Sequence, residues 1–182
     1  MRDLAMHIMD IAQNSLVAKA TTITIGITEN IEEDTYRIII EDNGIGMTQD
    51  YVATITDPYT TTRTTRKVGL GIPLLKQNAE RTGGNLEIES SLGVGTTVKA
   101  TFSLFHPDRP PVGDIAGTVV LLCGANPQVT FKFDYITSNG EFNFNTDEVN
   151  DTLEGISISD PSVIRFLKEM INENLELIGS SK

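Results

Sequence analysis

A pair of short alternating runs followed by a glycine-rich segment constrains the fold of this chain most. Between positions 22 and 28 isoleucine alternates with threonine and glycine, which predicts a strand with one buried face. A second strand is predicted over 36–41, joined to the first through an acidic turn at 29–34. It leads directly into Asp42–Met47, whose sequence is Asp-Asn-Gly-Ile-Gly-Met. A carboxylate and two glycines therefore follow the end of a buried strand.

The chemistry of this segment suits a purine base. A carboxylate such as Asp42 accepts a hydrogen bond from the exocyclic amino group of adenine, whereas the carbonyl oxygen of guanine at that position would be repelled. Gly44 and Gly46 lack side chains, so the backbone can approach a base closely. Two interpretations stay open on these residues alone, which are a plain turn and an adenine pocket.

A second glycine pair, Gly69-Leu70-Gly71, precedes a helix predicted over 72–82. The free N–H groups and the dipole at a helix start favour an anion such as phosphate. A basic cluster lies just before this turn (Arg63, Arg66 and Lys67) and could neutralise that charge. The alternative is a solvated charge cluster on a loop. The pattern is neither a Gly-x-x-x-x-Gly-Lys phosphate loop nor a dinucleotide fingerprint.

An amphipathic helix is predicted over residues 3–18, and His7, Asp10 and Asn14 share one of its faces. The amide oxygen of Asn14 is a hard ligand suited to Mg²⁺. Asp10, one turn earlier, could orient or deprotonate a nucleophile. The alternative for both is ordinary helix polarity. For His7 a surface or packing role is favoured over a ligand role.

The remaining pattern predicts a long loop over 48–68, a hairpin of strands 85–90 and 96–104, and a linker rich in proline and glycine at 106–114. Beyond the linker we predict a strand over 117–122 that ends at Cys123, taken as a small buried residue. A hairpin of strands 129–135 and 141–145 and a final helix from 159 or 160 to 178 complete the chain.

Length and charge exclude several classes of protein. A chain of 182 residues can bury one core, or one core and a small appendage. A net charge of −11 argues against a nucleic-acid partner. One cysteine allows no internal disulfide, and no apolar run approaches the ~20 residues of a membrane span. The start of the sequence does not resemble a signal peptide. We therefore expect a cytoplasmic protein.

The order of these pieces resembles the gyrase, heat-shock chaperone, histidine kinase and mismatch-repair ATP-binding superfamily, which has the Bergerat fold. The resemblance rests on Asp10-x-x-x-Asn14, Asp42-x-Gly-x-Gly46, Gly69-x-Gly71 and Gly93-x-Gly95-Thr96, four motifs in the family's order across residues 1–105. The short domain and the Asp57-Pro58-Tyr59 segment in a threonine-rich lid look closest to the histidine kinase and anti-sigma serine kinase branch.

The resemblance implies an α+β fold, namely a two-layer α/β sandwich with a mixed, mostly antiparallel sheet, to which residues 115–182 would add a small ββα appendage. It implies ATP and Mg²⁺ as ligands, with residues 48–68 as the ATP lid. The implied contacts are Asn14 to Mg²⁺, Asp42 and Thr96 to adenine, Gly69, Leu70 and Gly71 to phosphates, Lys67 and Arg63 also to phosphates, Gly44 and Gly46 beside the base, and Ser15, Ala18, Met47 and Ile72 lining the pocket.

The sequence departs from the family in two ways. Relatives that hydrolyse ATP, and the anti-sigma kinases, have Glu where this chain has Asp10, which keeps the charge on a shorter side chain. Histidine kinases phosphorylate a histidine on a separate helical hairpin, and this sequence has no room for one before residue 3; His7 is not expected to be the phosphoacceptor.

Three functions stay open. The first is transfer of the γ-phosphoryl group of ATP to a Ser or His of a partner protein, with Asp10 as the catalytic residue. The second is an ATP-operated regulatory binding module with little turnover, and the third is a weak ATPase. The role of residues 115–182 is open as well. They could dock on the ATP domain, or recruit a partner protein or a second copy of the chain.

Overall fold

The alternating runs form one six-stranded sheet in the computed structural model, which describes residues 3–56 and 70–181. The spatial order of the strands is β3-β4-β2-β1-β5-β6. Their bounds are β1 Thr22–Asn30, β2 Thr35–Asp42, β3 Asn85–Ser91, β4 Gly95–Ser103, β5 Thr130–Thr137 and β6 Gly140–Asn145. The helices are α1 Leu4–Val17, α2 Gln49–Ile55, α3 Gly71–Arg81, α4 Ile115–Ala125, α5 Thr146–Thr152 and α6 Pro161–Leu177.

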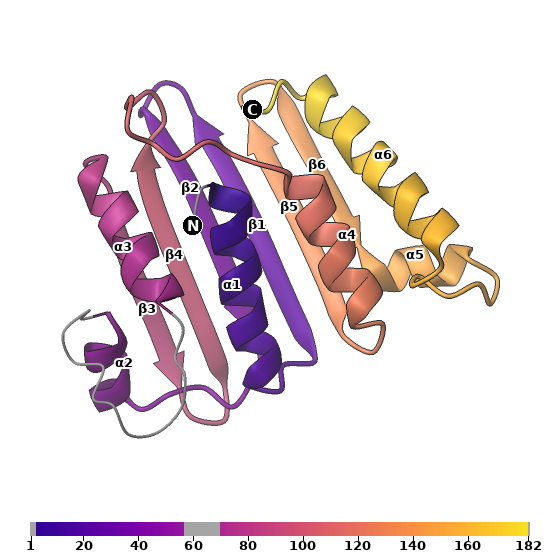
Figure 1. The fold of residues 1–182 in the computed structure, drawn as a ribbon, viewed down its shortest axis with the longest axis horizontal. Helices are drawn as coiled ribbons and strands as arrows, with labels where there is room; N and C mark the ends of the chain where they lie inside the picture. The colour runs from indigo at the N-terminus through magenta and orange to yellow at the C-terminus, as the bar shows by residue number, and fades with distance from the viewer. Residues whose placement is uncertain (1–2, 57–69, 182) are drawn as a thin grey trace.

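Within residues 3–56 and 70–181, the four longest helices cover one face of the sheet and none of them lies on the other. Figure 1 shows α1, α3, α4 and α6 side by side in front of the strands. The strands alternate so that every second side chain meets this helical layer, and Ile23, Ile25 and Ile27 of β1 are all buried there. The predicted two-layer α/β sandwich with a mixed, mostly antiparallel sheet is confirmed.

β1 joins the N-terminal and C-terminal parts of the chain. It pairs antiparallel with β2 on one side and parallel with β5 on the other. Parallel neighbours cannot be joined by a tight turn, and here residues 31–129 lie between the two strands in sequence. The predicted linker is packed as well, since the backbone N–H groups of Leu4 and Ala5 donate to the carbonyls of Pro111 and Val112 at 2.9 Å each.

The strand predicted over 117–122 is wrong, because these residues lie in α4. A short continuous apolar run fits a buried strand and a buried helix equally well, so its pattern does not decide between them. Asp114 caps the helix by accepting from the N–H of Gly117 at 2.8 Å. Cys123 is buried as predicted, and burial raises the pKa of its thiol to about 12.

No helix among residues 3–56 and 70–181 is long and apolar enough to cross a bilayer.

Two short helices were not predicted. α2 occupies the first part of the predicted loop 48–68 and is capped by the hydroxyl of Thr48, which accepts from the N–H of Tyr51 at 3.3 Å. α5 follows β6 directly, and Asn145 caps it. Both helices have seven residues, too few for an amphipathic period to stand out. Residues 57–69 lie outside the described part of the chain.

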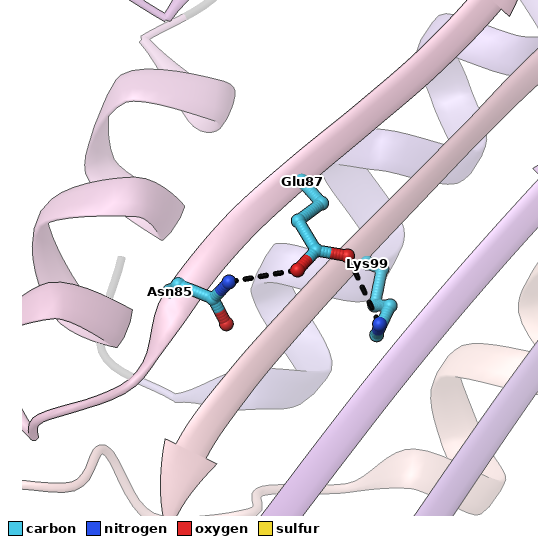
Figure 2. A network of polar contacts seen from close by, with 3 residues as sticks. All are labelled: Asn85, Glu87 and Lys99. Carbon is cyan, nitrogen blue, oxygen red and sulfur yellow. Dashed lines mark hydrogen bonds and ion pairs between the residues drawn. The ribbon is translucent and has the colours of Figure 1, made fainter.

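The helix-free face of the sheet is polar. Its residues pair across strands, and Lys99 on β4 donates to Glu87 on β3 at 2.9 Å, while Asn85 donates to the other oxygen of Glu87 at 2.9 Å (Figure 2). These contacts hold the pKa of the Glu87 carboxyl below its usual value. Such exposed ion pairs contribute little to stability, so the helix-covered face holds the fold together.

A polar cluster closes the end of the sheet where β1 finishes. Glu29, which is 7% exposed, accepts from the hydroxyl of Tyr135 and from the N–H and hydroxyl of Ser181 at 2.7 and 2.6 Å. The Tyr36 hydroxyl lies 3.4 Å from that of Tyr135, and the guanidinium of Arg109 lies 4.9 Å from the centre of the Tyr36 ring. Burial raises the pKa of both phenols, so they remain neutral donors.

Candidate functional site

The carboxylate of Asp42 lies at the opposite end of β2 from this cluster, on the helix-covered face. It is 9% exposed. Its Oδ2 accepts from the hydroxyl of Ser15 on α1 at 2.6 Å, and its Oδ1 accepts from the N–H of Gly44 at 2.8 Å. Each oxygen keeps acceptor capacity after these bonds, because an ionised carboxylate offers about four lone-pair sites. The two protein donors fix the orientation of a group that can still accept from a ligand.

The two glycines after Asp42 are required by close backbone contacts. A Cβ on Gly44 would lie 2.7 Å from the carbonyl oxygen of Ala18 and 2.9 Å from its Cβ. Gly46 adopts a φ of +67°, and a Cβ there would overlap the carbonyl of Ser91. The segment after β2 therefore runs tightly between the end of α1 and the β3–β4 turn. The sequence could not distinguish this packing from a plain turn.

The first turn of α3 packs against α1 at Asp10. A Cβ on Gly71 would lie 2.7 Å from Oδ2 of Asp10, so a larger residue there would displace this carboxylate. Leu70, the residue before the helix, is 64% exposed and makes no side-chain capping bond to it. The Leu70 side chain thus leaves the first N–H groups of α3 uncapped, and the Asp10 carboxylate lies beside the first residue of this turn.

His7 joins the same two helices one turn earlier on α1. It is 1% exposed, and its Nε2 lies 2.9 Å from Nδ2 of Asn78 on α3. An amide N–H₂ only donates, so His7 accepts and is neutral. Burial lowers the pKa of His7 to about 4. The packing role favoured for this histidine fits these contacts.

Thr96 follows the β3–β4 turn and lies beside Asp42. The two residues are direct partners across β4 and β2, so both side chains are on the helix-covered face. Thr96 in turn is opposite Ser90 of β3, and their hydroxyl oxygens are 2.8 Å apart. Ser90 was not among the predicted site residues. The alternation Leu86, Ile88, Ser90, which puts a hydroxyl at a buried position, was the signal that could have found it.

The predicted site residues divide into two groups. Residues 63, 67 and 69 lie outside the described part of the chain, so the predictions made for Arg63, Lys67 and Gly69 stay predictions. The structure brings the remaining ones to one end of the molecule, around the C-terminal half of α1, the end of β2 and the start of α3. These are Asp10, Asn14, Ser15, Ala18, Asp42, Gly44, Gly46, Met47, Leu70, Gly71, Ile72 and Thr96.

In residues 3–56 and 70–181, no group of three or more His, Cys, Asp or Glu side chains is placed to hold a metal ion. The described side chains alone therefore do not form a metal site. Asn14 is exposed on α1, one turn after Asp10. An amide oxygen in that position fits Mg²⁺, which keeps several waters and is shared with the phosphates of a nucleotide. The donor set therefore suits a metal that arrives with its ligand.

Comparison with known proteins gives a family for the N-terminal part. Residues 2–106 match the model of the family described as histidine kinase-, DNA gyrase B-, and HSP90-like ATPase. A probable C4-dicarboxylate sensor kinase of Halalkalibacterium halodurans is 30% identical over 111 residues, which are 59% of this chain and 20% of the relative. A protein of the same description from Bacillus subtilis is 32% identical over 72 residues, 40% of this chain and 14% of the relative.

The chain thus spans about a fifth or less of the length of these sensor kinases. Among solved structures, the MutL ATPase domain of Aquifex aeolicus, complexed with ADP, aligns with a TM-score of 0.48 and 17% identity over 94% of this chain and 70% of that one. The family match ends where the predicted linker begins, so residues 107–182 lie outside it.

Proposed function

The chain belongs to the histidine kinase-, DNA gyrase B- and HSP90-like ATPase family, and on that premise we propose that it binds Mg·ATP and transfers the γ-phosphoryl group to a Ser or His of a partner protein. Asp42 and Thr96 would receive adenine, and the first turn of α3 would receive the phosphates. Asp10 would act at the γ-phosphate. Together these groups would recognise the base, receive the phosphates and place a carboxylate at the γ-phosphate.

The observation that carries the proposal is how α1 spans the site. Ser15 of α1 is bonded to Asp42, while Asp10 of the same helix lies against Gly71 at the start of α3. Five residues of helix correspond to about 7.5 Å along its axis. One rigid helix therefore sets the separation between the group proposed for the base and the group proposed for the phosphates.

The transfer step assigns a role to Asp10 that differs with the acceptor. When a serine hydroxyl attacks the γ-phosphorus, the bond from phosphorus to the β,γ-bridging oxygen breaks, ADP leaves, and the hydroxyl proton goes to the Asp10 carboxylate. A neutral histidine needs no base to attack, and Asp10 would then orient its ring. Mg²⁺, held by Asn14 and the phosphates, would supply charge neutralisation.

A second function is an ATP-operated binding module with little turnover. The observation that favours it is the C-terminal part of the chain, which lies outside the family match yet extends the same sheet through β5 and β6. These strands, with α4, α5 and α6, add surface that nucleotide binding alone does not require. In this case ATP would alter the affinity for a partner, as expected when a ligand favours one conformation.

The test is incubation of the full chain with γ-labelled ATP and Mg²⁺, alone and with a lysate of the source organism. Label on a second protein supports phosphoryl transfer, free phosphate supports a weak ATPase, and nucleotide binding without either supports the binding module. Asp10→Asn should retain ATP binding and lose transfer. The matched control is Asp151→Asn, which makes the same change on an exposed residue of α5. Equal transfer by Asp10→Asn and the wild type would remove the catalytic role.

A further inference from the structure

Ser90 is a buried hydroxyl at the centre of three hydrogen bonds beside the proposed adenine position. It is 6% exposed and stands on the helix-covered face of β3. Its Oγ lies 2.8 Å from the N–H of Met47, 3.0 Å from the carbonyl oxygen of Gly95 and 2.8 Å from Oγ1 of Thr96. The three partners come from the segment after β2 and from the start of β4.

Only one arrangement of protons satisfies all three contacts. A backbone N–H only donates and a carbonyl oxygen only accepts, so Ser90 accepts from Met47 and donates its single proton to Gly95. The lone pair that remains on Ser90 can only accept. The hydroxyl of Thr96 must therefore donate to Ser90, and the Thr96 oxygen stays available only as an acceptor.

This arrangement fixes what Thr96 can offer to a ligand. Thr96 is partly exposed and directly opposite Asp42 across the two strands. With its proton held by Ser90, its oxygen is an acceptor only, as is the Asp42 carboxylate. An amino group at the edge of a base finds two acceptors there, whereas a carbonyl oxygen finds no donor.

We propose that Ser90 is a positioning residue for nucleotide specificity, which holds the Thr96 hydroxyl as an acceptor and so favours adenine over guanine. This inference rests on the proposed ATP site. Without Ser90 the Thr96 hydroxyl rotates and donates to the carbonyl oxygen of guanine, so discrimination falls while the Asp42 carboxylate remains.

The test measures the dissociation constants of Mg·ATP and Mg·GTP for the full chain, and their ratio is the readout. Ser90→Ala should lower the preference for ATP about three- to tenfold, the range expected for loss of one oriented neutral hydrogen bond. Thr96→Val should lower it by a similar factor. The double variant should be no worse than Thr96→Val alone, because Ser90 acts through Thr96.

Control variants separate this role from a structural one. Ser91→Ala changes the next residue of β3, which is exposed, and should leave the ratio unchanged. Ser90→Cys fills the same space with a weak acceptor and should also lower the ratio, which covers the case that Ser90→Ala does not fold. A thermal melt establishes that each variant is folded.

The outcomes distinguish the two proposals. Ser90 variants that weaken ATP and GTP equally, or whose effect adds fully to that of Thr96→Val, overturn the specificity role and leave ATP binding intact. A wild-type protein that binds neither nucleotide overturns the proposed function as well.

Discussion

Two buried carboxylates stand at opposite ends of the same sheet face, and their surroundings differ in one respect. Glu29 accepts three hydrogen bonds from the protein, including two from Ser181 near the C-terminus. Asp42 accepts two, one on each oxygen, from Ser15 and Gly44. The chain itself therefore supplies more of the donors to Glu29, whereas both oxygens of Asp42 keep acceptor capacity for a donor from outside.

Burial alone does not identify a carboxylate that binds a ligand. Both groups are less than a tenth exposed. What separates them is how many donors the protein supplies, which are three for Glu29 and two for Asp42. Glu29 should therefore contribute to stability, and Asp42 to ligand binding.

The largest expected effect is on stability, at the end of the sheet that holds Glu29. Glu29→Leu leaves the hydroxyls of Tyr135 and Ser181 without their acceptor, which should lower the free energy of unfolding by about 3 kcal/mol. Chemical denaturation measures it. Glu32→Leu, the same change at an exposed position of the neighbouring turn, is the control and should cost much less. A Glu29→Leu protein as stable as the control would show that the two ends do not differ as described.

Acid should lower the free energy of unfolding through His7, which is buried between α1 and α3. The pKa of His7 is lowered from 6.5 to about 4 in the folded chain, so between these values the unfolded chain binds more protons. The contribution is fully present above pH 6.5 and is lost as the pH falls toward 4, up to about 3 kcal/mol. His7→Gln should remove this part of the pH dependence, measured as unfolding free energy against pH. An unchanged slope would contradict the buried neutral state.

Binding of Mg·ATP should change on substitution at the other end of the sheet, which holds Asp42. Asp42→Asn replaces an acceptor with a group that can also donate, so Mg·ATP should bind about 10- to 100-fold more weakly, as expected for loss of a charged hydrogen bond. The preference for ATP over GTP should fall with it. Calorimetry measures both. Unaltered preference would take Asp42 out of base recognition, and a large loss of stability would make it resemble Glu29.

The smallest effect is expected from removing one of the three hydrogen-bond donors to Glu29. Ser181→Ala removes the bond to Oε2 of Glu29 and keeps the backbone N–H, so the free energy of unfolding should fall by about 1 kcal/mol. ATP affinity should not change. Differential calorimetry on this variant, beside Ser180→Ala as a neighbouring change, tests it. A change in ATP affinity would mean that the two ends are coupled.

The sequence predicted the strands better than the short helices. β1 and β2 begin or end within two residues of their predicted bounds, because alternation over a half-buried strand is a strong signal. α4 was mistaken for a strand, since an apolar run without polar interruptions has no period to measure. The parallel pairing of β1 with β5 could not be predicted, because it depends on contacts between residues far apart in sequence.

The functional site was predicted only in part, because some of its residues lie in a local sequence motif and others do not. Asp42 and the glycines carry a local motif, and the resemblance supplied their order. Ser90 and Glu29 carry no motif and are recognised only by the face on which they lie. Glu29 continues the buried positions 23, 25 and 27, yet it was assigned to the acidic turn after the strand. A polar residue at a buried position of a strand is thus a second sequence signal for a polar cluster, beside the motifs.

The pairing of β1 with β5 also matters while the chain is being made. Until β5 emerges from the ribosome, β1 is an edge strand with a row of unpaired backbone groups, which invites association with other nascent chains. Synthesis proceeds at roughly 5–20 residues per second, so the residues from the end of the family match to the end of β5 take a few seconds. During that interval the N-terminal strands depend on translation speed, or on a chaperone, for protection.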